Sequence, residues 1–332
     1  MNRAARSQQF TESCWYGQSW VSVVLAPLAW LFGLLTAVRR RCYAAGFFRV
    51  HKAGLPVIVV GNITAGGTGK TPVVAWLADE LQQRGLHPGI ISRGYGGTAG
   101  AQPRHVKADS DPAECGDEPL LLARLTGLPV VVCRDRLAAA RQAGQLGANV
   151  IIADDGLQHY RMHRDAEIAV IDGDRMFGNG RRVPAGPLRE AVSRLASVDA
   201  VLINGGGSDL GRRFDLRVAS AVALDGSMER PLRDFSGQEV WAVAGIGNPR
   251  RFFAALRELG IRLREVVLAD HGRTSLAKLL TAAQLPVLMT QKDAVKYSPV
   301  AGSDIWYVPA TLEITDADAA AVVGAIMTKL TV

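Results

Sequence analysis

GNITAGGTGKTP, residues 61–72, stands directly after the apolar run LPVIVV. The apolar run predicts a buried strand, the glycines predict a turn, and Lys70 with Thr71 predicts the start of a helix. This order is typical of a phosphate-binding loop, in which backbone N–H groups and a lysine surround phosphate oxygens. The hydroxyl group of Thr71 can bind Mg²⁺. Pro72 fits the first helical turn, where its missing N–H costs nothing.

The loop departs from the usual GxxxxGK[ST] pattern, because Thr64 stands where the pattern has its first glycine. Glycines occur at positions 61, 66 and 67 instead. An ordinary glycine-rich turn is the alternative interpretation, but GKT at the start of a helix favours a nucleoside triphosphate site. We expect the nucleotide to be bound by Thr64, Ala65, Gly66, Gly67, Thr68, Gly69, Lys70 and Thr71.

Composition limits the class of protein. The chain has 332 residues, of which 48% are hydrophobic, so it is long enough for one large or two ordinary globular domains. Its net charge of +7 favours an anionic partner, which could be nucleic acid, an acidic membrane surface or a phosphorylated substrate. The four cysteines show no CxxC spacing, so neither a zinc site nor a disulfide framework is indicated.

Residues 20–38, WVSVVLAPLAWLFGLLTAV, carry no charge and are followed by Arg39, Arg40 and Arg41. This length is just sufficient to cross a hydrocarbon core, and the arginines would then remain in the cytoplasm. A helix that lies in the membrane interface is the alternative, since hydropathy alone does not separate the two. A cleaved signal peptide is disfavoured because no small-residue cleavage site follows. We expect membrane association through this segment.

Short apolar runs alternate with helical stretches along the rest of the chain, which predicts an α/β fold of the P-loop NTPase type, with a mostly parallel sheet and helices on both faces. The expected strands are 56–60, 88–92, 129–133, 149–153 and 167–171, and the expected helices are 70–84, 118–126 and 135–146. The expected domains are an N-terminal hydrophobic, membrane-associated helix (1–50), a core domain (51–207) and a smaller α/β domain (208–332) whose last helix can pack back on the core.

Two groups of polar residues follow predicted strands. Asp154 and Asp155 end the run VIIADD, and an acid at this place after a phosphate-binding loop is the expected Mg²⁺ ligand. A pair of acids that caps a turn is the alternative. Arg93 and Tyr95 in SRGYGG follow an earlier strand, whose carboxyl end faces the ligand crevice of an open α/β sheet. A surface turn would explain these two residues equally well.

Three further motifs contain residues that could be catalytic, but a purely structural role would explain each of them as well. Asp117 and Glu118 stand at a predicted helix start, where acids are ordinary caps. The DH pair at 270–271 ends an apolar run, and a single histidine is more often structural than catalytic. Arg189 and Glu190 belong to a long loop rich in glycine, proline and arginine, and they suit a phosphate contact or a surface ion pair.

Taken together, the motifs GNITAGGTGKTP, SRGYGG, GDEPLLLA, DDGLQH, PAGPLRE, the DH pair and QKDAVK resemble the tetraacyldisaccharide 4'-kinase family, the lipid A 4'-kinases of Gram-negative bacteria. The ordered motifs span residues 57–297, and the hydrophobic N-terminus matches as well. The resemblance implies transfer of the γ-phosphate of ATP, with Mg²⁺, to the 4'-hydroxyl of a tetraacyldisaccharide 1-phosphate. It places this reaction at the cytoplasmic face of the inner membrane.

The resemblance also implies roles for single residues. Asp117 becomes the catalytic base, His271 orients it, Lys70 holds the β- and γ-phosphates, and Arg189 acts at the transferred group. The implied candidates for Mg²⁺ and its water shell are Thr71, Asp154, Asp155 and Gln158. The implied substrate contacts are Arg93, Tyr95, Glu118 and Glu190.

A membrane-associated P-loop ATPase switch without a lipid acceptor is the rival class. Its phosphate-binding loop and basic surface would look similar, but it needs no acceptor base such as Asp117. Nucleic-acid binding is not expected, because aromatic residues are not interleaved with the basic clusters. The expected partners are the lipid substrate and the membrane surface, and we expect a monomer.

Overall fold

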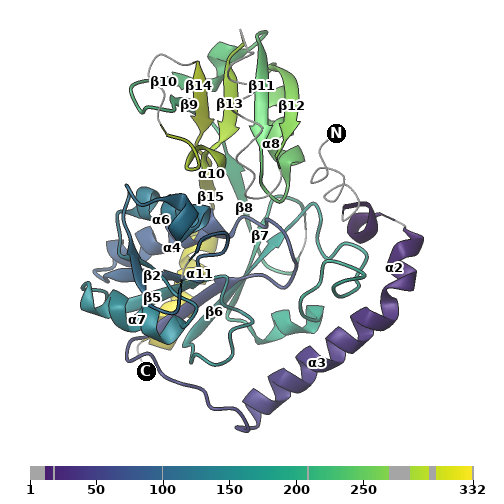
Figure 1. The fold of residues 1–332 in the computed structure, drawn as a ribbon, viewed down its shortest axis with the longest axis vertical. Helices are drawn as coiled ribbons and strands as arrows, with labels where there is room; N and C mark the ends of the chain where they lie inside the picture. The colour runs from purple at the N-terminus through teal and green to yellow at the C-terminus, as the bar shows by residue number, and fades with distance from the viewer. Residues whose placement is uncertain are drawn as a thin grey trace. The chain divides into compact units, whose positions relative to one another are not determined.

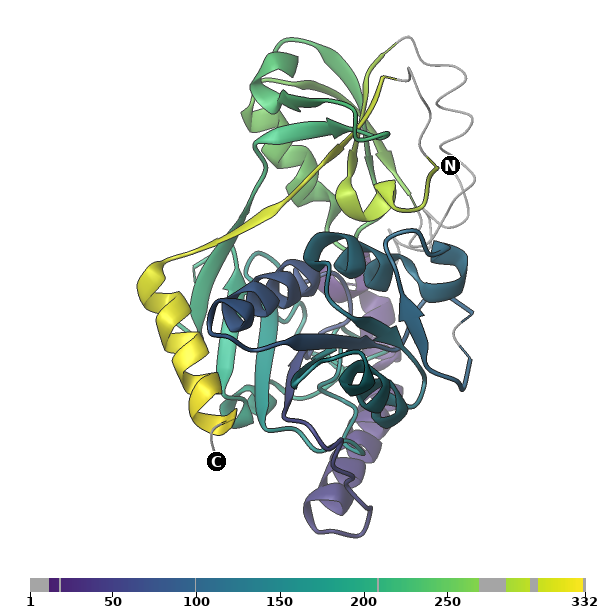
Figure 2. The same cartoon turned by 90° about the vertical axis from the view of Figure 1, so that its left-hand side faces the viewer.

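The computed structural model describes residues 12–17, 19–98, 100–207, 209–268, 285–298 and 304–330. Within these ranges the chain forms two compact units (Figure 1). The larger unit contains the described residues between Ser7 and Asp215 and those from Leu312 onward, and the smaller unit contains those between Leu216 and Thr311. The C-terminal helix, drawn in yellow, therefore belongs to the larger unit (Figure 2).

A nine-stranded sheet forms the centre of the larger unit. Its strands, in sheet order, are β15 (Thr311–Ile314), β8 (Arg212–Arg217), β7 (Ala200–Asn204), β6 (Ala166–Asp172), β1 (Val57–Gly61), β5 (Val150–Asp154), β2 (Pro88–Ser92), β4 (Val130–Val132) and β3 (Arg104–Val106). The pairs from β8 to β4 are parallel, and β3 runs antiparallel to β4. The predicted mostly parallel α/β sheet is confirmed.

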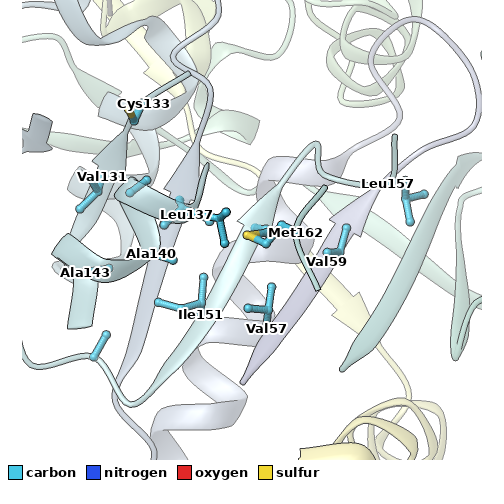
Figure 3. Packing of buried hydrophobic residues seen from close by; sticks show 14 of the residues in the cluster. Val57, Val59, Val131, Cys133, Leu137, Ala140, Ala143, Ile151, Leu157 and Met162 are labelled. Atoms are coloured by element: carbon cyan, nitrogen blue, oxygen red, sulfur yellow. The ribbon is translucent and has the colours of Figure 1, made fainter. Parts of the chain in front are cut away.

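Helices pack against both faces of this sheet. On one face, Leu137, Ala140 and Ala143 of α7 (Arg136–Gln145) pack with Val57 and Ile151 (Figure 3). Helix α4 (Lys70–Gln83) contacts the same two strands with its own buried apolar side, and α6 (Asp117–Thr126) packs beside α4. Because successive side chains of a strand point to opposite faces, both faces of β1 and β5 are apolar. This explains their continuous apolar runs.

The expected strands and helices agree with the structure to within about two residues, which is the usual uncertainty of element ends. Helix α6 begins at Asp117, one residue earlier than expected, after the short helix α5 (Pro112–Cys115). Its N-cap is Gly116, and no side chain caps it. Asp117 is therefore the first residue of α6 rather than its N-cap, and with Glu118 it lies in the first turn, where acidic side chains interact favourably with the helix dipole.

Of the two alternatives for residues 20–38, a membrane-spanning helix and a helix in the membrane interface, the described residues do not form the first. The segment forms α2 (Trp20–Val24) and α3 (Ala26–Ala44), with a break at Leu25 before Pro27, whose ring cannot continue the preceding helix. The uncharged part of α3 ends at Val38, roughly 20 Å from its start at 1.5 Å per residue, whereas a hydrocarbon core is about 30 Å thick. Among the described residues, no helix combines the length and apolar character needed for a span.

The smaller unit is built on a six-stranded sheet. Its order is β10 (Glu229–Pro231), β9 (Ser220–Ala223), β14 (Ile305–Val308), β13 (Val287–Thr290), β11 (Glu239–Ala244) and β12 (Arg262–Val267). The strands from β14 to β12 pair in parallel, and β9 and β10 are antiparallel additions. Helix α8 (Pro249–Glu258) packs on β11 and β12, and the short α10 (Gln291–Ala294) follows β13.

The QKDAVK motif lies inside the smaller unit. Asp293 is fully buried, and its carboxylate accepts hydrogen bonds from the backbone N–H of Gly245 at 2.8 Å and from the hydroxyl of Thr290 at 2.5 Å. Its other oxygen accepts from Lys296 Nζ at 2.8 Å. The motif therefore joins the ends of β11 and β13, because a buried carboxylate requires such partners.

Candidate active site

The phosphate loop connects β1 to α4, as the sequence predicts. Gly69 is the N-cap of α4 and has φ 95°, a left-handed conformation that favours glycine. A Cβ at Gly69 would lie 2.6 Å from Asn204 Nδ2, so a side chain here would displace the buried amide of Asn204. No side chain caps this helix start, and the N–H groups of its first turn suit an anionic ligand.

Two buried amides hold the phosphate loop. Asn62 Nδ2 donates to the carbonyl of Gly66 at 3.3 Å and contacts Thr68 Oγ1 at 3.4 Å. Asn204, at the end of β7, donates from Nδ2 to the carbonyl of Thr68 at 3.2 Å. Sequence reasoning assigned neither asparagine a role. The only local signals were the position of Asn62 inside the loop and that of Asn204 at the end of an apolar strand.

The long loop that contains PAGPLRE pairs with the phosphate loop through backbone hydrogen bonds. The N–H of Ala65 donates to the carbonyl of Pro187 at 2.7 Å, and the N–H of Arg189 donates to the carbonyl of Ile63 at 2.7 Å. Thr64 and Leu188 form an antiparallel bridge between these two bonds. The loop is therefore a structural part of the phosphate site, and it delivers Arg189 to that site.

Two cations converge on Asp155, which follows β5. Arg189 lies 3.1 and 3.2 Å from the two oxygens of this carboxylate, and Lys70 Nζ lies 3.5 Å from one of them. Burial opposes ionisation of Asp155, but Lys70 and Arg189 outweigh it and lower its pKa to about 2. The carboxylate is therefore ionised at neutral pH.

Asp154, one residue earlier, has the opposite environment. It is 1% exposed, and both carboxylate oxygens are buried without a hydrogen-bond partner. Burial, followed by the charge of Glu118, raises the pKa of Asp154 to about 7. Lys70 and Arg136 oppose this rise, and Arg136 Nη1 bonds the backbone carbonyl of Asp154 at 2.8 Å rather than its carboxylate. An orphaned buried carboxylate beside a phosphate loop fits a divalent cation such as Mg²⁺.

Gln158 and Glu190 are joined beside the phosphate loop. Gln158 Nε2 donates to Glu190 Oε1 at 2.8 Å and to the carbonyl of Asn62 at 3.0 Å. Glu190 is 8% exposed, and its second oxygen accepts a hydrogen bond from the hydroxyl of Tyr160. Burial and this hydrogen bond raise the pKa of Tyr160 to about 12, so Tyr160 is a donor at neutral pH. Sequence reasoning did not single out Tyr160.

Asp117 lies at the start of α6, next to the SRGYGG loop, and only 5% of its surface is exposed. Gly116 has φ 91°, and a Cβ there would lie 2.6 Å from the carbonyl oxygen of Tyr95. This contact places the backbone of the loop beside Asp117. The side chains of Arg93 and Tyr95 are exposed.

The larger unit thus brings together Lys70, Asp154, Asp155, Arg189, Gln158 and Glu190 around the phosphate loop. Thr71 lies half-buried in the first turn of α4. Asp270 and His271 lie outside the described residues, so the implied pairing of His271 with Asp117 stays a prediction.

The fold and the site define a P-loop nucleotide-binding enzyme with a cation pair and two acids beside its phosphate loop. A profile of the tetraacyldisaccharide-1-P 4'-kinase family matches residues 21–330, and the chain belongs to this family. It is 50% identical over 309 residues to the tetraacyldisaccharide 4'-kinase of Halorhodospira halophila, covering 92% of this chain and 93% of the relative. The identity to the enzyme of Methylobacillus flagellatus is 47% over 315 residues, or 92% of each chain.

A solved structure supports the same assignment. LpxK from Aquifex aeolicus, crystallised in complex with ATP, superposes with a TM-score of 0.75 at 27% identity and covers 92% of this chain and 99% of that chain. The family, the relatives and this structure favour the kinase over the ATPase switch.

Proposed function

We propose that this protein transfers the γ-phosphate of ATP to the 4'-hydroxyl of a tetraacyldisaccharide 1-phosphate in lipid A biosynthesis. Family membership supports the reaction. The main structural support for the position of the active site is that Lys70 and Arg189 both contact Asp155 beside the phosphate loop. Two cations at this place can stabilise the negative charge that develops on the transferred group and on ADP.

The acid pair and Thr71 would hold Mg²⁺, which neutralises phosphate charge when it is bound. Asp154 offers two oxygens without partners, Asp155 is ionised beside Lys70, and Gln158 stands next to both the loop and Glu190. The backbone N–H groups at the start of α4 and the ammonium group of Lys70 would bind the β- and γ-phosphates.

Asp117 would act as the base. The 4'-hydroxyl oxygen attacks the γ-phosphorus, its proton moves to the Asp117 carboxylate, and ADP leaves with the electrons of the broken P–O bond. His271 would orient Asp117, and Glu118, Arg93 and Tyr95 would contact the acceptor. The position of the SRGYGG backbone beside Gly116 supports a shared acceptor site for Arg93, Tyr95 and Asp117.

The acyl chains and the membrane would meet the protein at α3. Leu28, Trp30, Leu31 and Leu35 of this helix are exposed, which suits a helix lying in the membrane interface. A cavity of about 450 Å³ lies between α3 and the PAGPLRE loop, lined by Ala29, Trp30, Leu188 and Val192 among others. The catalytic domains would then work at the cytoplasmic side of the bacterial inner membrane.

The test is incubation of detergent-solubilised protein with γ-labelled ATP, Mg²⁺ and a tetraacyldisaccharide 1-phosphate, followed by separation of lipid from inorganic phosphate. We expect label in the lipid, lost in Lys70→Ala and Asp117→Ala, with ATP binding retained in Asp117→Ala. Asp109→Ala removes an exposed acid and is the matched control. Label in inorganic phosphate alone would favour the ATPase switch.

A further inference from the structure

Tyr160 stands at the centre of a polar chain that ends at the phosphate loop. Its hydroxyl donates to Glu190, the same carboxylate accepts from Gln158 Nε2 at 2.8 Å, and Gln158 Nε2 also donates to the carbonyl of Asn62 at 3.0 Å. Asn62 in turn holds the phosphate loop through the carbonyl of Gly66. The Tyr160 hydroxyl is therefore connected to the loop by a continuous series of contacts.

Helix α3 contacts the other side of the same residue. The Arg39 guanidinium lies 5.8 Å from the centre of the Tyr160 ring and 5.7 Å from that of Tyr43, and the two rings are 5.9 Å apart. Arg39 Nη1 also donates to the backbone carbonyl of Gln158 at 3.4 Å. These distances are typical of cation–π and aromatic pairs.

Glu190 links this chain to the cation pair. It follows Arg189 directly, and its buried carboxylate lies between Tyr160, Gln158 and the Nε of Arg194, which is 3.6 Å away. Fixing the side chain of Glu190 restricts the backbone from which Arg189 reaches Asp155. A change at Tyr160 is therefore expected to reach the transferred phosphate through Arg189, without a direct contact.

We propose that Tyr160 is a positioning residue, which couples the docking of helix α3 through Arg39 to the placement of Glu190 and Arg189 beside the phosphate loop. The inference rests on the proposed kinase function. It gives α3 a second task beside contact with the membrane: the helix also orders the catalytic loop, so a protein with α3 displaced binds ATP but transfers phosphate slowly.

The test compares three variants in the lipid-phosphorylation assay with purified full-length protein. Tyr160→Phe keeps the ring and removes only the hydroxyl, and Arg39→Ala removes the contact from α3. Arg161→Ala is the matched control, because it removes an exposed arginine next to Tyr160. We expect kcat to fall about tenfold or more in the first two variants, with the KM for ATP changed less than about twofold, as expected when one charge-assisted hydrogen bond to a positioning group is lost.

Two further measurements separate the positioning role from other effects. Co-sedimentation with vesicles that contain anionic lipid should be unchanged in Tyr160→Phe, which keeps every charge, so its loss of kcat would not come from weaker membrane binding. Thermal unfolding should be nearly unchanged in Arg39→Ala, which keeps the inference testable even where Tyr160→Phe folds poorly.

The outcomes are distinguishable. Unchanged kcat in folded Tyr160→Phe, or a loss of kcat in Arg161→Ala as large as in Arg39→Ala, would overturn the positioning role alone. Wild-type protein that releases label only as inorganic phosphate would overturn the proposed function itself.

Discussion

Replacing Asp154 with asparagine should stabilise the nucleotide-free protein at neutral pH and abolish phosphotransfer. The carboxylate is buried, both its oxygens lack hydrogen-bond partners, and Glu118 adds a like charge nearby. A neutral amide of the same shape avoids the cost of holding this charge away from water. The same substitution removes a proposed Mg²⁺ ligand, so the stability and activity of the protein should change in opposite directions.

The magnitude follows from the pKa of Asp154, which burial raises from 3.8 to about 7. Between these two values the unfolded chain has released the proton that the folded protein still holds. The free energy of unfolding therefore falls as pH rises through this window, by about 1.4 kcal/mol per pH unit. The loss totals about 4 kcal/mol at pH 7 and above, and it is absent in Asp154→Asn.

The assay is urea denaturation of both proteins, free of nucleotide and Mg²⁺, at several pH values from 4.5 to 8. Titration of groups that do not interact with Asp154 affects both proteins equally and cancels in the difference. Asp154→Asn should gain stability relative to wild type as pH rises, and the gain should level off above pH 7. A difference that stays within about 1 kcal/mol over the whole range would refute the assigned environment of Asp154.

Three further predictions test other parts of the larger unit. Asn204→Leu should raise the KM for ATP several-fold, measured by steady-state kinetics, because it leaves a buried carbonyl of the phosphate loop without its donor. Arg194→Met should lower the free energy of unfolding by about 2 kcal/mol in urea titrations, because the buried Glu167 carboxylate loses Arg194 and keeps only Arg164 as a cationic partner; adding Glu167→Gln should restore part of the loss. Under native conditions a thiol reagent should label the partly exposed Cys42 well before Cys115, whose pKa burial raises to about 11, as mass spectrometry would show.

The cause of each difference between expectation and structure can be named from particular residues. The sequence left open whether residues 20–38 span the membrane or lie in its interface, because hydropathy does not separate the two, and the break before Pro27 divides the uncharged segment into two helices. Asp117 was expected just before the helix, but Gly116 occupies the N-cap and Asp117 is the first helical residue. Both differences concern local backbone geometry near the end of a helix, where short sequence signals compete.

The sequence by itself determined the phosphate loop, the flanking β1 and α4, and the mostly parallel sheet. These elements are created by hydrogen bonds between near neighbours and by burial of short apolar runs, and both leave a local pattern of apolar residues and glycines. Tertiary structure alone decided which side chains meet. The contact of Asn204 with Thr68 joins residues 136 positions apart, and Arg189 reaches Asp155 only because its loop pairs with the phosphate loop. The opposite pKa shifts of Asp154 and Asp155 have the same origin, because burial and neighbouring charge are properties of the packed chain. Two adjacent aspartates carry no sequence signal that distinguishes them.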